Sequence, residues 1–254
     1  MALSELHDRL RFVLVRTSHS GNIGSAARAI RTMGFDRMTL VAPHRFPDPE
    51  ATALAAGADD VLANAAIHED LVSGLAGTTF ALGLSARRRG VNLPELDPRE
   101  GAAQAIAAAR RGEQVALVFG NERTGLENDE LSRCHAMVRI PSVDDFSSLN
   151  LSQAVQVVAY EIRMALVAEE AKAPEVALDP DEVPADAEQV ERFFTHLAET
   201  LDDIEFHKGR SPTTIMLKLR KLFLRARPEL RELRILHGIL ADAQRMAGMA
   251  KKGD

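Results

Sequence analysis

Three polar segments of the chain contain side chains that could bind a ligand or take part in a reaction. The first, residues 18–28, is a glycine-bearing turn into a helix and contains Asn22 and Arg28. The free N–H groups at the start of a helix bind anions. The segment is also typical of an ordinary tight turn in which Asn22 caps the helix and Arg28 is a surface residue. It has neither the glycine pattern of dinucleotide sites nor the Gly-Lys-Ser/Thr pattern of nucleoside triphosphate sites, so those two interpretations fail.

The second segment, residues 117–126, leads from a short apolar run into polar residues. Gly120 ends the run, and the missing side chain lets a ligand approach the backbone closely. Glu122 and Arg123 follow after Asn121. A plain alternative is that these two side chains form a surface ion pair.

The third segment, residues 140–155, begins with Ile140 and continues into a run of serines around Asn150. Its structural alternative is a helix start capped by Ser147 or Ser148. Each of the three segments, taken alone, is only weak evidence for a functional site.

Strands and helices alternate along the first two thirds of the chain. Apolar runs predict strands at residues 12–15, 38–41, 80–84 and 115–119. Helices are predicted at 22–33, from Asp97 to Arg110 with Pro98 in its first position, and at 148–167. This alternation predicts an α/β fold, a mostly parallel sheet with helices on both faces. Ligands of such sheets bind beyond the carboxyl ends of the strands, where the three segments lie.

Composition narrows the class of protein. The 254 residues are 46% hydrophobic, enough for one core and a smaller appendage. The first eleven residues contain no apolar stretch, so we expect no signal peptide and a cytoplasmic protein. The single cysteine, Cys134, excludes an internal disulfide, and no His and carboxylate spacing predicts a metal site.

Charge divides the C-terminal third. Residues 169–191 contain nine acidic residues and one lysine, and 169–188 also have the proline content of a linker. We therefore expect a domain at 1–168, a linker at 169–188 and a helical module at 189–254. Residues 207–234 contain nine Lys or Arg and two Glu. Such a basic module fits RNA phosphates, although a solubilising cap or a partner-binding hairpin has the same pattern.

The helical module has a predicted inward and outward side. The predicted inward side chains of its first helix are Phe193, Leu197, Leu201 and Ile204. Those of its second helix are Ile215, Leu219, Leu222 and Phe223. The outward basic side chains, and our candidates for RNA contact, are Lys218, Lys221 and Arg225.

Taken together and in order, the three segments resemble the signature motifs of the SpoU branch of the SPOUT RNA 2′-O-methyltransferases. The matching residues are Asn22 and Arg28, then Gly120, Asn121, Glu122 and Gly125, then Ile140, Pro141, Ser148, Leu149, Asn150 and Ser152. Further stretches are similar to the TrmJ-type branch, which methylates the anticodon loop of tRNA. They are Thr32-Met33-Gly34, Ala55-Ala56-Gly57-Ala58, Ser85-Ala86-Arg87 and the tail from Lys218 to Phe223.

The resemblance implies a trefoil knot near the third motif, a homodimer, and S-adenosyl-L-methionine bound in the knot loops. It implies cofactor contacts from Ser85, Ala86, Arg87, Gly120, Ile140, Ser147, Ser148 and Leu149. It also implies catalysis by Arg28, as a base or as a phosphate clamp, oriented by Asn22, Glu122, Ser148 and Asn150. The expected substrate is the 2′-hydroxyl of cytidine or uridine at position 32 of tRNA.

Methylation of ribosomal RNA and a catalytically silent RNA-binding relative remain open as functions, whereas a Rossmann-like oxidoreductase is disfavoured. The last lacks the glycine fingerprint that its cofactor needs. The dimer is expected to use apolar residues of the 148–167 helix, namely Val155, Val158, Ala159 and Ile162. The alternative is that these four side chains belong to the core of a single chain.

Overall fold

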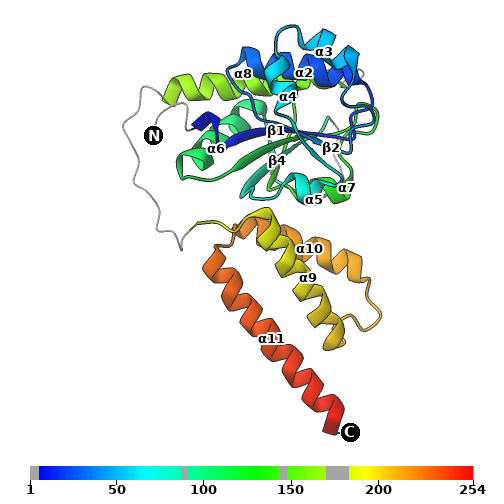
Figure 1. Cartoon of the computed structure of the whole chain (residues 1–254). Helices are drawn as coiled ribbons and strands as arrows, with labels where there is room; N and C mark the ends of the chain where they lie inside the picture. The colour runs from blue at the N-terminus through cyan, green and yellow to red at the C-terminus, as the bar shows by residue number, and fades with distance from the viewer. Residues whose placement is uncertain (1–5, 87–90, 144–147, 170–182, 254) are drawn as a thin grey trace. The chain divides into compact units, whose positions relative to one another are not determined.

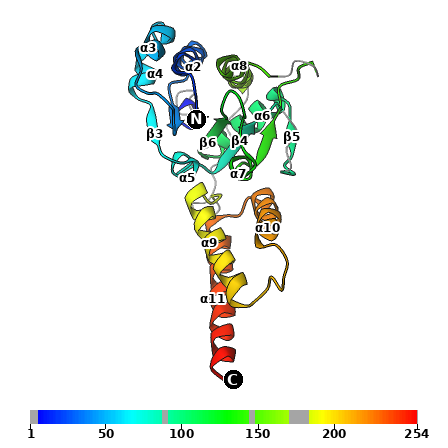
Figure 2. The ribbon, with the colours of Figure 1, turned by 90° about the vertical axis from the view of Figure 1, so that its right-hand side faces the viewer.

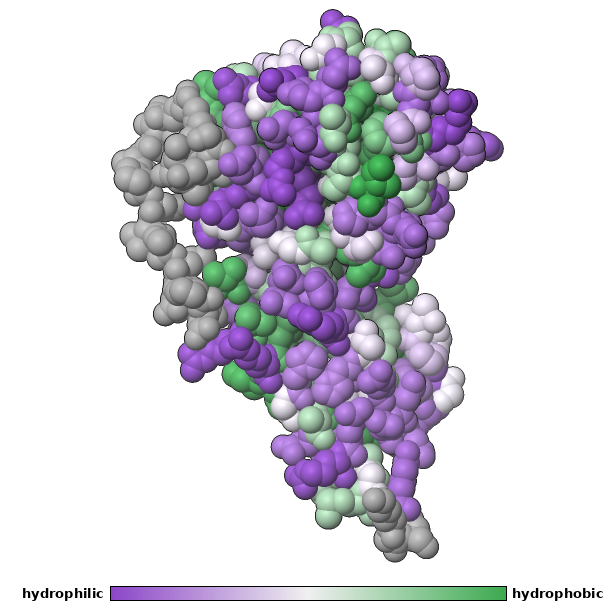
Figure 3. Space-filling view, viewed as in Figure 1, coloured by the Kyte–Doolittle hydropathy of each residue, from purple (hydrophilic) through white to green (hydrophobic). Residues whose placement is uncertain are grey.

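The computed structural model describes residues 6–86, 91–143, 148–169 and 183–253. The chain forms two compact units, Met1–Ala177 and Leu178–Asp254. Within the described ranges, no helix has the length and apolar character needed to cross a membrane. The face drawn in Figure 3 is mostly hydrophilic over both units, and its apolar residues form separate small groups.

A seven-stranded sheet lies at the centre of the first unit (Figure 1). Its strand order is β3-β2-β1-β6-β4-β7-β5, and every neighbouring pair is parallel. The strands are β1 (Leu10–Val15), β2 (Met38–Val41), β3 (Ala66–His68), β4 (Phe80–Leu84), β5 (Glu95–Leu96), β6 (Val115–Phe119) and β7 (Ala136–Val138). The predicted α/β architecture is confirmed. The apolar runs located β1, β2, β4 and β6, whereas β3, β5 and β7 are two or three residues long and too short to show a period.

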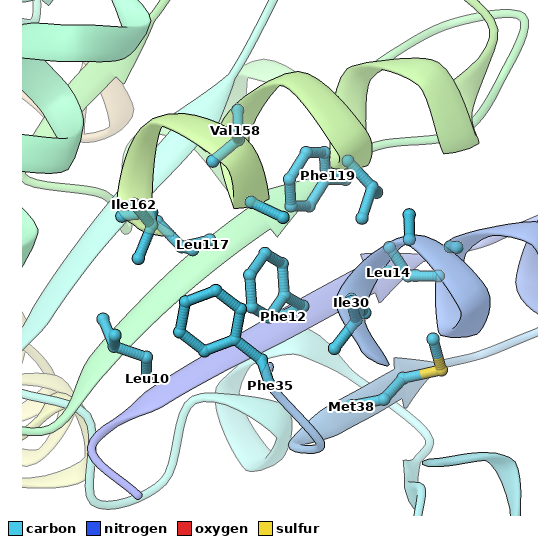
Figure 4. Close-up of a cluster of buried hydrophobic side chains, with 14 of the residues drawn as sticks. Leu10, Phe12, Leu14, Ile30, Phe35, Met38, Leu117, Phe119, Val158 and Ile162 are labelled. Carbon is cyan, nitrogen blue, oxygen red and sulfur yellow. The ribbon is translucent and has the colours of Figure 1, made fainter. Parts of the chain in front are cut away.

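Three long helices cover one face of the sheet: α2 (Ser20–Thr32), α6 (Pro98–Arg110) and α8 (Leu151–Glu169). Their apolar side chains meet those of the strands in one core (Figure 4). Phe12 of β1 lies in this core between Phe35 and Phe119, with ring centroids 5.5 and 6.3 Å away. The start of α6 matches the prediction, because Asp97 forms a capping box with Glu100.

Short helices lie on the opposite face. Figures 1 and 2 show α5 (Leu71–Gly74) and α7 (Asn128–Leu131) on that side, and α2, α3 (Pro49–Ala55) and α8 on the other. Alternate strand residues such as Val13 and Val118 are fully buried there, as expected for a strand covered on both faces. The remaining short helix, α4 (Asp59–Ala63), follows α3. The prediction of helices on both faces is thus correct, although the two layers differ in size.

The third polar segment begins α8 at a different residue from the one predicted. The helix starts at Leu151, and the side chain of Asn150 accepts a hydrogen bond from the backbone N–H of Ser152 at 2.9 Å. Asn150 is therefore the cap, and the alternative of a Ser148 cap is wrong. Ser147 lies outside the described residues, as does the rest of 144–147, so the implied knot near this motif stays a prediction.

The second unit consists of α9 (Ala187–Asp203), α10 (Pro212–Ala226) and α11 (Leu230–Gly253) around a small core that includes Phe193 and Phe194. The predicted start of α10 is correct, because Ser211 caps the helix and Pro212 is its first residue. The end of the predicted linker belongs to this unit. Ala185 is buried in its core, and the Asp186 side chain caps α9.

Two predicted inward side chains of the second unit are exposed. Leu222 is 47% exposed, because α10 packs most deeply through Leu224, which lies about 160° away around the helix. Ile204 is 40% exposed, because α9 ends at Asp203 and Ile204 has left the buried face. The other predicted inward residues of these helices pack in the core.

Candidate active site

A pocket opens at the carboxyl ends of β4, β6 and β7. Its empty volume is about 760 Å³, which includes solvent space at its open mouth. Its lining residues are Leu84, Ser85, Ala86, Phe119, Gly120, Asn121, Glu122, Arg123, Thr124, Gly125, Val138, Ile140, Ser148, Leu149, Leu151 and Ala154. The fold therefore brings the second and third polar segments together with the end of β4.

Six of the predicted cofactor residues line this pocket: Ser85, Ala86, Gly120, Ile140, Ser148 and Leu149. Two others, Arg87 and Ser147, lie outside the described residues. Apolar side chains of the strand ends form much of the wall, and polar groups come mostly from the loops. This mixture suits a ligand with a flat apolar part and polar ends.

The Glu122 side chain joins the second segment to the first. Its carboxylate accepts hydrogen bonds from the backbone N–H groups of Ser18 at 2.8 Å and His19 at 3.2 Å, and from Asn22 Nδ2 at 2.9 Å. The carboxylate thus satisfies donors at the start of α2. It forms no ion pair with Arg123, so the alternative of a surface ion pair is wrong.

The Asn22 side chain then joins the first segment to the third. Its Oδ1 accepts a hydrogen bond from Asn150 Nδ2 at 2.9 Å. Asn22 is not the cap of the helix, since α2 already begins at Ser20. Asn22, Glu122 and Asn150 therefore form one chain of hydrogen bonds that connects all three motifs.

The surroundings of Glu122 favour the ionised form of its carboxyl group. Burial raises the pKa of its carboxyl, but the hydrogen bonds from Asn22, Ser18 and His19 outweigh burial and hold that pKa below its ordinary value. A carboxylate with a lowered pKa is a poor proton acceptor near neutral pH. Glu122 is therefore suited to orienting its neighbours.

The turn after β6 is closed by its own backbone and held by Arg16. Gly125 N–H donates to the Asn121 carbonyl at 2.7 Å. Arg16 donates to both carboxylate oxygens of Glu130 at 2.8 Å and to the Gly125 carbonyl at 3.4 Å. A Cβ on Gly120 would lie 2.1 Å from the nitrogen of Leu126. Gly120 is thus required for closure of the turn, because any larger side chain at this position would clash with the backbone of Gly125 and Leu126.

Arg28 lies apart from this pocket within a single chain. It is on α2 six residues after Asn22, and its side chain is exposed. It is not among the described lining residues, and no described residue pairs with its guanidinium. The predicted catalytic set is therefore only partly assembled by one chain.

Sequence reasoning missed two basic residues of this site. Arg16 follows β1 in a left-handed conformation, with φ of 53°, and no pattern in the sequence indicated its contacts. Arg123 was noticed only as half of an ion pair. The neighbouring Asn121 was part of the motif, and its side chain donates to the Arg16 carbonyl at 2.6 Å and to Ser18 Oγ at 2.7 Å.

The described part of the chain offers neither a cluster of metal ligands nor a reactive thiol. It contains no group of three or more His, Cys, Asp or Glu arranged to hold a metal ion. Cys134 is fully buried, and burial raises the pKa of its thiol to about 12. A thiol with that pKa is a packing residue at neutral pH.

The predicted RNA-contact residues lie on α10. Lys218 and Arg225 are exposed and Lys221 is partly exposed. The neighbouring Arg220 differs from them, because it forms a two-pronged ion pair with Glu191 and lies 4.3 Å from the centre of the Phe194 ring. Arg220 therefore holds α10 to α9 and is not free to bind phosphate.

Comparison with known proteins identifies the two parts of the chain. Residues 9–160 match the model of the SpoU rRNA Methylase family, and residues 188–252 match the C-terminal domain of the tRNA methyltransferase TrmJ. The tRNA (cytidine/uridine-2'-O-)-methyltransferase TrmJ of Salmonella typhi is 50% identical over 92% of this chain and 96% of its own.

Solved structures give the same result. TrmJ from Z. mobilis has 33% identity and a TM-score of 0.79, covering 91% of this chain and 97% of its own. A probable methylase family protein from Haemophilus influenzae has 37% identity and a TM-score of 0.63, covering 95% and 98%. The structure of a protein studied for 2-OH methylation of C/U34 on tRNA covers only 63% of this chain, but 97% of its own, at 25% identity and a TM-score of 0.51. The chain therefore belongs to the SpoU rRNA Methylase family and carries a TrmJ-type C-terminal domain.

Proposed function

We propose that this protein transfers a methyl group from S-adenosyl-L-methionine to the ribose 2′-hydroxyl of a cytidine or uridine in tRNA. The observation that supports this most is the likeness to tRNA (cytidine/uridine-2'-O-)-methyltransferases, which extends over 92% of the chain and includes the C-terminal domain. With a tRNA substrate, we expect the protein in the cytoplasm. The expected target, position 32 of the anticodon loop, comes from the TrmJ-type resemblance.

The residues of the pocket fit the cofactor. Leu84, Phe119, Ile140 and other apolar side chains offer a dry surface for an adenine ring, and the polar rim offers hydrogen bonds to a ribose. Gly120 lines the pocket, and its missing Cβ leaves room for the backbone of the closed turn. When bound, the cofactor would supply an electrophilic methyl group on a sulfonium and leave as the neutral thioether S-adenosylhomocysteine, while the 2′-hydroxyl would release its proton to solvent.

The protein then has to position the ribose and favour loss of that proton. The hydrogen-bonded chain of Asn22, Glu122 and Asn150 fixes the three motif loops relative to one another. We assign to Arg28 the role of promoting loss of the proton from the ribose 2′-hydroxyl. A guanidinium stays charged in proteins, so clamping the phosphate beside the target ribose is its less demanding role.

We further propose that Arg28 acts in the pocket of a second copy of the chain. The four residues expected to form the dimer surface are buried in the core of a single chain, so they cannot form it: Val155, Val158, Ala159 and Ile162. A different face of α8 is exposed, where Tyr160, Met164 and Val167 are 42–48% exposed at helical spacing. Burying this face against a partner fits a homodimer, and it would explain why the pocket of one chain lacks Arg28.

Mixed dimers test the assignment of Arg28. One subunit carries Arg28→Ala, and the other carries Ala154→Trp to fill the pocket. If Arg28 acts across the interface, random mixing should restore about a quarter of wild-type turnover, because half of the dimers regain one of two sites. If it acts within its own chain, no mixture regains activity. Sedimentation of the wild-type protein as a monomer at micromolar concentration would contradict the dimer itself.

The function is tested by mass spectrometry of tRNA nucleosides from a strain that lacks the protein, and with purified protein, S-adenosyl-L-methionine and tRNA. We expect the loss of one 2′-O-methylated cytidine or uridine and its return on adding the protein. The same assay on ribosomal RNA tests the alternative substrate. Methylation of ribosomal RNA alone would overturn the proposal, and so would the absence of any methyl transfer.

A further inference from the structure

Arg123 is a cation at the pocket that has no described partner. It lines the pocket and its side chain is exposed. Its backbone N–H donates to Asn121 Oδ1 at 2.9 Å, but no described residue pairs with its guanidinium. Among the described lining residues it is the only Lys or Arg.

The neighbouring acid does not neutralise this charge by contact. One carboxylate oxygen of Glu122 accepts from Asn22 and His19, and the other accepts from Ser18. These donors turn the carboxylate toward the start of α2. The guanidinium of Arg123 is thus left to interact with solvent or with a ligand.

The backbone that carries Arg123 is fixed. Asn121 and Gly125 pair across the turn, and Arg16 holds both the Gly125 carbonyl and Glu130. Asn121 also anchors the turn to the end of β1 through the Arg16 carbonyl. Because the backbone under Arg123 is already ordered, only its side chain has to be ordered when a ligand binds, which lowers the cost of binding.

We propose that Arg123 binds the anionic group presented at the open end of the pocket. This inference rests on the proposed function, which brings two anions to the site: the carboxylate of the cofactor's amino-acid end and the phosphodiester beside the target ribose. A guanidinium binds either anion through two parallel hydrogen bonds. Arg123 is thereby a binding residue with a role separate from that of Arg28.

Calorimetry and kinetics on the full-length protein test this role and identify the anion. The variants are Arg123→Ala and Arg123→Lys. The control is Arg45→Ala, which removes the same charge from an exposed side chain that does not line the pocket. The ligands are S-adenosylhomocysteine, 5′-methylthioadenosine, which lacks the amino-acid part, and a tRNA transcript.

If the anion is the carboxylate, Arg123→Ala should weaken S-adenosylhomocysteine binding roughly 10- to 100-fold and leave 5′-methylthioadenosine binding unchanged. If the anion is the phosphate, both affinities should stay the same, while KM for tRNA rises about tenfold and the salt slope of tRNA binding falls by a little under one. In either case Arg123→Lys should recover only part of the loss.

The inference is overturned if Arg123→Ala equals Arg45→Ala in all three ligand affinities, KM and salt slope. A wild-type protein that binds S-adenosylhomocysteine and methylates tRNA shows that the proposed function stands when this happens. A wild-type protein that does neither refutes the proposed function, and the Arg123 inference falls with it.

Discussion

Replacing Glu122 with alanine should destabilise the first unit and abolish methyl transfer. The carboxylate accepts three hydrogen bonds, from the N–H groups of Ser18 and His19 and from Asn22. Each hydrogen bond to a charged group contributes about 1.5–3 kcal/mol net. The donors are only partly buried and can bind water in the variant, so we expect a total loss of about 2–4 kcal/mol. In a domain of this size that corresponds to a melting temperature lower by roughly 5–15 °C.

The assay is differential scanning calorimetry of the full-length protein at pH 7, with methylation of a tRNA transcript measured in parallel. The matched control is Glu127→Ala, which removes an acid from the same loop whose side chain is 62% exposed in its ion pair with Arg16. An exposed pair contributes less than about 1 kcal/mol, so this control should melt within a few degrees of wild type. Equal melting temperatures for the two variants would refute the anchoring role of Glu122.

Acid adds a second test of the same carboxylate. Hydrogen bonds hold the pKa of Glu122 below its ordinary value despite burial, so the folded state favours the ionised form. The stability that Glu122 provides is therefore present above its ordinary pKa and is lost as pH falls through the lowered folded value. The Glu122→Gln variant should lack this part of the acid dependence. A variant with the same acid profile as wild type would contradict the assignment.

Three further predictions concern other parts of the chain. Neutralising the outward basic residues of α10 should raise the Kd for tRNA and leave cofactor affinity unchanged. The salt dependence of tRNA binding should become shallower by a little under one for each phosphate contact that is lost. An unaltered salt dependence would mean that α10 has another role. The variant is Lys218→Ala/Lys221→Ala/Arg225→Ala. Cys134 should resist alkylation at pH 8 until the protein unfolds, because burial raises its pKa to about 12; labelling of the native protein followed by mass spectrometry checks this. Burial, His196 and Arg192 lower the pKa of His237, so the second unit should lose stability as pH falls below the ordinary histidine value, and His237→Asn should flatten that dependence in thermal melts followed by circular dichroism.

The amino-acid sequence alone predicted the four longer strands and the family. The apolar runs at residues 12–15 and 115–119 predicted two central strands, because a strand covered on both faces is apolar at every position. Asp97 and Pro98 marked a helix start by local backbone chemistry. The order of the three motifs predicted the family because each motif is a short, contiguous stretch.

Which side chains contact one another became clear only from the three-dimensional fold. The adjacent charges of Glu122 and Arg123 suggested an ion pair, but packing of α2 against the turn after β6 places unsatisfied N–H groups beside the carboxylate, and these are its partners. Asn22 joins the motif network, whereas Arg28, six residues later, is exposed without a described partner, because the two residues lie about 120° apart around α2. Interactions of this kind connect residues about a hundred positions apart in the chain, and local patterns carry no information about them.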